Sequence, residues 1–123
     1  MKIIVAGGRD FNDYVTLAKI LNEYIDPLLD MVISGDARGA DELGALWAER
    51  HNIQVRHYPP DWDYYGHAAG FIRNLEMGDD ADAAICFWDG KSKGTEHMIK
   101  TMKNLKKPYK VFNYQGEKIM EGG

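Results

Sequence analysis

The sequence predicts one α/β domain: a Rossmann-like, doubly wound sheet of about five parallel strands with helices on both faces. Three observations predict it. Short β-branched runs alternate with longer segments of helical period along the 123 residues. The strand runs are apolar without a break, as in strands that are buried on both faces. Strand–helix alternation through five cycles implies parallel strands joined by right-handed crossovers.

The individual elements follow in order between turn signals. We expect strands at residues 3–5, 31–33, 53–58, 82–88 and 109–113, and helices that begin near residues 13, 39, 67 and 95. Asn12 or Asp13 can cap the first helix. On the second helix Leu46 should face the core, and on the fourth Met98 and Leu105 should do the same.

The length of the chain fits a single domain. We assign residues 1–115 to a Rossmann-like nucleotide-binding domain and residues 116–123 to a tail or a short edge strand. The single cysteine, Cys86, excludes an internal disulfide, and its apolar run AAICFW predicts a buried, inert thiol. The start MKIIVAGG enters a strand at once, so we expect no signal peptide, no membrane span and a cytoplasmic location. No metal or cofactor is expected.

The charge balance bears on partners. The formal net charge is −4 and the pI is about 5.5, which argues against broad electrostatic capture of nucleic acid or of an anionic membrane. Five lysines between residues 100 and 110 are explained by a solvated helix face and turn. We therefore expect neither nucleic acid nor a membrane as a partner.

Three glycine-rich loops indicate a ligand site. GGRDFND, SGDARGAD and DGKSKGTEH each follow a predicted strand, so all three lie at one edge of the sheet, where doubly wound folds bind ligands. Glycine lets backbone amides approach a ligand, and a helix N-terminus favours an anion. The alternative is that any α/β fold places glycine in such turns. A P-loop is excluded, because Ile85 stands where its first glycine is required.

The predicted ligand-binding residues come from these loops and from the third helix. They are Gly7, Gly8, Arg9, Asp10, Ser34, Gly35, Arg38, Gly39, Asp41, Arg73, Asn74, Asp89, Gly90, Gly94 and Thr95. Arg38 and Arg73 would add charge-assisted hydrogen bonds to a phosphate, and Asp41 would hold a ribose. The alternatives are a solvated turn residue for Arg38 and a snorkelling side chain for Arg73. Leu75 is expected to face the core, which would put Arg73 near the buried boundary.

An aromatic loop, DWDYYG, separates the third strand from the third helix. Trp62, Tyr64, Tyr65 and His67 could stack on a base or cover the pocket. They could equally pack against a partner subunit, which permits a homodimer, or roof the core. The sequence leaves these three roles open.

The ordered motifs resemble a known superfamily. GGRDF, SGDARGAD, HAAGFIRNLEM and FWDGKSKGTEH together resemble the SLOG superfamily (the Smf/DprA and LOG-like Rossmannoid domains) and, within it, the small YspA-like members. The resemblance runs up to about Met102 and implies a nucleotide or nucleotide-derived ligand. The related LOG enzymes release the base from a nucleoside 5′-monophosphate. By this resemblance Gly94 and Thr95 contact phosphate and Arg73 reaches the sugar-phosphate.

One departure from the LOG enzymes bears on catalysis. Their catalytic glutamate is replaced here by Met98, whose spacing marks a core residue. Glu96 or Asp89 could take over its role, although nothing in the spacing demands it, and the nearby His97 could donate a proton. We therefore expect a module that binds or senses a nucleotide. The alternative is a phosphoribohydrolase with Arg73, Glu96 and Asp89 as its catalytic residues. Single-stranded DNA binding, which the DprA branch suggests, is disfavoured by the acidic balance.

Overall fold

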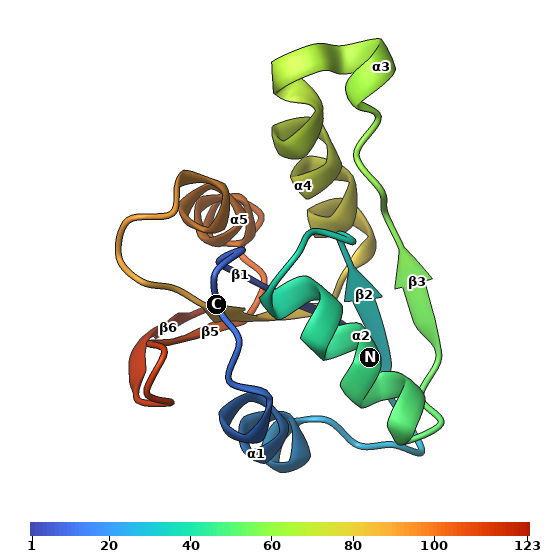
Figure 1. The fold of residues 1–123 in the computed structure, drawn as a ribbon, viewed down its shortest axis with the longest axis vertical. Coiled ribbons are helices and arrows are strands. Elements are labelled where there is room, and N and C mark those ends of the chain that lie inside the picture. The colour runs from blue at the N-terminus through green and yellow to red at the C-terminus, as the bar shows by residue number, and fades with distance from the viewer.

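Strands and helices alternate along the chain, and the computed structural model describes residues 1–123 (Figure 1). The strands are β1 (Lys2–Gly7), β2 (Met31–Ser34), β3 (Val55–His57), β4 (Ala83–Phe87), β5 (Tyr109–Phe112) and β6 (Lys118–Gly122). The helices are α1 (Tyr14–Tyr24), α2 (Ala40–Arg50), α3 (Trp62–Tyr65), α4 (Ala69–Asp80) and α5 (Lys93–Asn104), with the 3₁₀ turn η1 (Gly66–Ala68) between α3 and α4. The predicted cap of α1 is Asp13, whose carboxylate accepts a hydrogen bond from the Thr16 amide.

The six strands form one sheet in the order β3-β2-β1-β4-β5-β6. All neighbouring strands are parallel except β5 and β6, which are antiparallel. The chain builds outward from β1 to β3 and then crosses back, through α4, to the other side of β1. The strand order therefore reverses between β1 and β4, at the switch point where doubly wound folds bind ligands. The predicted fold class is confirmed, with β6 as an added antiparallel strand at the end of the chain.

Successive strand residues point alternately into two apolar layers, which explains why the strands are apolar throughout. Ile3 packs toward α1 and α2 with Trp47, whereas its neighbour Ile4 packs toward α4 and α5 with Met98. Met98 is 1% exposed, so the prediction of a core residue is confirmed. Cys86 is fully buried as expected, and burial raises the pKa of its thiol to about 12.

Several leucines were placed wrongly from helical spacing alone. Leu75 is 50% exposed, Leu105 39% and Leu46 36%, although each was expected to face the core. On α4 the buried face runs instead through Arg73 and Asn74. The N-terminal half of α4 stands beside a polar pocket rather than on the sheet, so the buried face of that half is polar.

The aromatic loop is partly helical. Residues 62–66, expected to belong to a loop, form α3 and the start of η1, and Asp61 caps α3 by accepting a hydrogen bond from the Tyr64 amide. Figure 1 shows α3 and the start of α4 standing clear of the sheet, above the ends of β2 and β3. No helix of the chain is long and apolar enough to cross a membrane.

Candidate functional site

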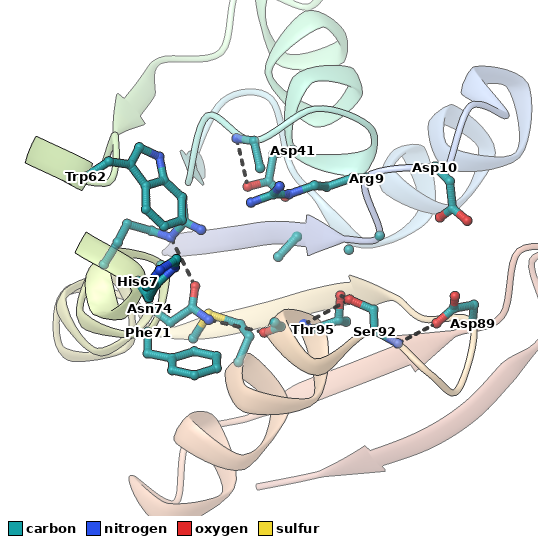
Figure 2. Close-up of a pocket in the computed structure, with 18 residues that line it drawn as sticks. Arg9, Asp10, Asp41, Trp62, His67, Phe71, Asn74, Asp89, Ser92 and Thr95 are labelled. Carbon is teal, nitrogen blue, oxygen red and sulfur yellow. Dashed lines mark hydrogen bonds between the residues drawn. The ribbon is translucent and has the colours of Figure 1, made fainter. Parts of the chain in front are cut away.

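A pocket of about 460 Å³ opens at the switch point, beyond the carboxyl ends of β1 and β4. We call it the switch-point pocket. Its walls come from the loop after β1, the start of α2, the α3–α4 segment and the loop that leads into α5. Figure 2 shows Arg9 and Asp41 on one side, Trp62, His67 and Phe71 on another, and Asp89, Ser92 and Thr95 along a third.

Ten of the predicted ligand-binding residues line this pocket. They are Gly7, Gly8, Arg9, Asp10, Asp41, Arg73, Asn74, Asp89, Gly94 and Thr95. Arg38 lines an adjoining pocket and Gly39 lines a third one. None of these three pockets is lined by Ser34, Gly35 or Gly90. Glu96 also lies outside the pocket and pairs with Lys100, with 3.6 Å between its carboxylate and the Lys100 ammonium. Whether these residues bind a ligand stays a prediction.

Arg73 is held in place by its neighbours. It is 8% exposed, its Nε donates to the Asn74 side chain over 3.1 Å, and its guanidinium also donates to the carbonyl of Gly35. Asn74 in turn donates to the carbonyl of Gly94 over 3.1 Å, which ties α4 to the start of α5. An arginine offers five N–H donors, so this anchoring leaves Arg73 with donors for the pocket.

Asp41 is the most buried charged group of the site. Burial raises its pKa to about 6, although Arg73 and the amides of Ala37 and Gly7 act in the opposite direction. Gly35 lies between the two side chains, since a Cβ on it would stand 2.6 Å from Arg73 Nη1 and 2.8 Å from Asp41 Oδ2. A side chain at this position would therefore displace the Arg73 guanidinium or the Asp41 carboxylate from its present place.

Several backbone amides of the glycine-rich loops already donate hydrogen bonds to carboxylates of the chain. The amides of Lys91 and Ser92 both donate to Asp89 Oδ1 over 2.8 Å. The Ala37 amide donates to Asp41 over 3.4 Å. The amides expected to hold a phosphate lie elsewhere, at Gly94 and Thr95, and of these the Thr95 amide donates to Ser92 Oγ over 3.4 Å. At the Asp89 and Asp41 loops each carboxylate takes the place that an anion would occupy. No group of three or more histidine, cysteine, aspartate or glutamate side chains could hold a metal ion.

An aromatic wall closes the pocket on the α3–α4 side. Trp62 and Phe71 line it and remain about half exposed, at 47% and 45%. Phe71 packs on His97, with ring centroids 4.5 Å apart. Trp62 and His67 were candidates for such a role from the sequence, whereas Phe71 was not. The FIRN run gave no signal for it, because an aromatic residue on a helix is usually buried in the core.

A second pocket, of about 330 Å³, adjoins the first. We call it the arginine pocket, because Arg9, Arg38 and Arg73 all line it, together with Pro59, Pro60 and Asp36. The carboxylate of Asp36 pairs with His57, whose Nδ1 lies 2.6 Å away. Trp62, Ala37, Arg9 and Arg73 line both pockets and thus form the wall between them.

The fold has a solved counterpart. The chain is similar to DNA processing protein A from Helicobacter pylori, whose structure is described for its single-stranded DNA binding mode. The TM-score is 0.63 at 19% sequence identity, and the match covers 91% of this chain. The chain spans 65% of the length of that protein. At this level of identity the likeness supports the Rossmann-like fold.

Two expectations of the sequence analysis are corrected by this likeness. The expected function, a module that binds or senses a nucleotide or alternatively a hydrolase, was wrong. The expectation that nucleic acid is not a partner was wrong as well. The physical reason is that the net charge of −4 sums over the whole surface, whereas a strand contacts only the groups that line its site.

The family of the chain follows from two sequence matches. The chain is 32% identical over 107 residues to the Gene 61 protein of Mycobacterium phage D29, a match that covers 80% of this chain and 86% of the phage protein. The sequence model of the YspA, cpYpsA-related SLOG family matches residues 1–65. The resemblance inferred from the ordered motifs is confirmed: the chain belongs to the YspA, cpYpsA-related SLOG family.

Proposed function

We propose that the chain binds single-stranded DNA, with one unpaired base in the switch-point pocket. The observation that carries the proposal is the arrangement of that pocket: an exposed aromatic wall, Trp62 and Phe71, stands across an open recess from Arg9. Proteins that bind single strands combine aromatic platforms for the bases with cationic groups for the backbone.

The size and chemistry of the pocket fit one nucleotide. Its volume of about 460 Å³ lies within the usual range of small-ligand sites. Trp62 offers a stacking surface, while the carboxylates of Asp10 and Asp89 offer acceptor oxygens for a base edge. A base within a duplex is stacked and paired, so only an unpaired base can enter such a recess without a cost of a few kcal/mol.

The acidic balance of the chain does not oppose this function, because many of its carboxylates are engaged far from the pocket. Asp80 accepts hydrogen bonds from Lys2, Arg56 and Tyr58, and Asp30 pairs with the N-terminal ammonium. Arg9 and Arg38 beside the pockets take part in none of the ion pairs of the chain.

The likeness to DNA processing protein A from Helicobacter pylori supports the same proposal. That protein is described as binding single-stranded DNA, and this chain shares its fold over 91% of the residues. The likeness favours DNA over RNA as the strand to test first.

The experiment compares Trp62→Ala with Tyr64→Ala by fluorescence anisotropy of a labelled dT12 strand. Tyr64 is the matched control, because it lies on the same short helix, is 78% exposed and lines neither pocket. Stacking on one base contributes roughly 1–3 kcal/mol, so Trp62→Ala should weaken binding about 5- to 150-fold. Tyr64→Ala should bind like the parent.

Two outcomes would refute the proposal. One is a parent protein that binds dT12 no better than a duplex of the same length. The other is an equal affinity of the parent and Trp62→Ala for dT12. A single-stranded RNA of the same length, run in parallel, would identify RNA as the partner instead if it bound more tightly than dT12.

A further inference from the structure

The two pockets differ in charge. Three arginines and one aspartate line the arginine pocket, and that aspartate, Asp36, lies within hydrogen-bond distance of His57. Two arginines and three aspartates line the switch-point pocket, Asp41 among them. A phosphate is therefore favoured in the arginine pocket and disfavoured in the switch-point pocket.

None of the three arginines of the arginine pocket forms an ion pair within the chain. The guanidinium groups of Arg9 and Arg38 form no ion pair, and Arg73 donates only to uncharged oxygens. The pKa of Arg73 is lowered, first by burial and further by the positive charge of Arg9, although Asp41 acts in the opposite direction. Cationic groups gathered around a recess repel one another, and an anion between them removes that cost.

The loop amides offer no better place for the phosphate. The Asp89 carboxylate accepts hydrogen bonds from the amides of Lys91 and Ser92, and the Asp41 carboxylate accepts one from the Ala37 amide. A phosphate at either loop would meet a carboxylate at the position that it would take. Arg38, by contrast, lies on an exposed turn and lines the arginine pocket together with Pro59 and Pro60.

We infer that the arginine pocket binds the phosphodiester group next to the base held in the switch-point pocket, so that the recognised unit is a dinucleotide. This inference rests on the proposed function. Arg9 and Arg73 line both pockets and can contact the same linkage from both sides, while Arg38 contacts it from the arginine pocket alone. Trp62 stands in the shared wall, where a base can stack on it as the backbone passes from one pocket to the other.

The experiment compares Arg38→Gln with Arg50→Gln in binding to dT12. Arg50 is the matched control, because its loss changes the net charge equally and it lies over the Tyr14 ring, outside both pockets. Arg38→Gln should weaken binding about tenfold or more, as expected for a lost charge-assisted hydrogen bond. It should also lower the slope of log K against log salt by about 0.7, the value for one phosphate contact on a single strand.

A second strand keeps the test specific to the backbone. In a dT12 with neutral methylphosphonate linkages there is no charge for Arg38 to contact, so the parent and Arg38→Gln should bind it equally. If Trp62→Ala loses binding to ordinary dT12 while Arg38→Gln behaves like Arg50→Gln, the phosphate subsite is refuted and the proposed function stands. If the parent does not bind dT12 at all, both are refuted.

Discussion

Replacing Asp41 by asparagine should remove a pH dependence of stability that the buried carboxylate imposes. The pKa of Asp41 is raised by burial to about 6 in the folded chain, against a reference value of 3.8. Between these two values the folded chain binds more protons than the unfolded chain. Linkage then requires the free energy of unfolding to rise as the pH falls from above 6 toward 4.

The magnitude follows from the size of the shift. One pKa unit corresponds to 1.36 kcal/mol, so the shift of Asp41 from 3.8 to about 6 amounts to about 3 kcal/mol in total. About two-thirds of it, roughly 2 kcal/mol, is gained between pH 7.5 and pH 4.5. For a domain of this size that corresponds to several degrees in the midpoint of thermal unfolding.

The assay is urea unfolding of the parent and of Asp41→Asn at several pH values between 4.5 and 7.5. The difference between the two proteins isolates Asp41, because other titrating groups contribute equally to both. One of these is His97, whose pKa is lowered chiefly by burial, so that it acts in the opposite direction. If the two proteins show the same change in unfolding free energy with pH, the carboxylate is not buried as described.

Three further predictions concern the packing and stability of the chain. Gly39 and Gly90 share a φ of +82°, but a Cβ would collide with the Gly8 carbonyl only at Gly39. In urea unfolding, Gly90→Ala should lower the free energy of unfolding by about 1 kcal/mol and Gly39→Ala by clearly more. Equal losses would contradict the packing around Gly39. Asp80→Asn should lower the unfolding free energy at pH 7 by about 1 kcal/mol, because Asp80 accepts three side-chain hydrogen bonds, and no change would show that these bonds are not maintained. Cys86 should react with a thiol reagent only after unfolding, so rapid labelling of the native protein would contradict its burial.

The sheet and its two core layers could be predicted from the sequence because strand burial leaves a direct signal. Uninterrupted apolar runs such as AAICF occur only where both faces of a strand are covered. Met98 was assigned correctly for the same reason, since its whole side of α5 packs on the sheet. The helix α4 did not follow this logic: beyond the sheet its buried face lines a pocket, so Arg73 is buried and Leu75 is exposed.

The chemistry of the loops was harder to predict than their position. The glycine-rich turns indicated the edge of the sheet where the switch-point pocket opens. Which of their amides are free to bind a ligand depends on which groups of the chain already accept hydrogen bonds from them. The Asp89 side chain turns back and accepts hydrogen bonds from the amides of its own loop. The spacing of residues in the sequence does not predict that conformation. The three arginines of the arginine pocket were among the predicted ligand-binding residues. Their grouping in a second pocket with Pro59 and Pro60 was not predicted, because these residues come from separate segments of the chain.

The most direct test of the account is an NMR titration of the ¹⁵N-labelled chain with dT12, which reports the contacted residues one by one. We expect the largest shift changes at the amides of residues 7–9, 36–38 and 70–74, which surround the two pockets. Changes confined to the lysine-bearing face of residues 100–110, or to the edge strand β6, would place the strand elsewhere on the chain. That result would contradict binding at the switch point.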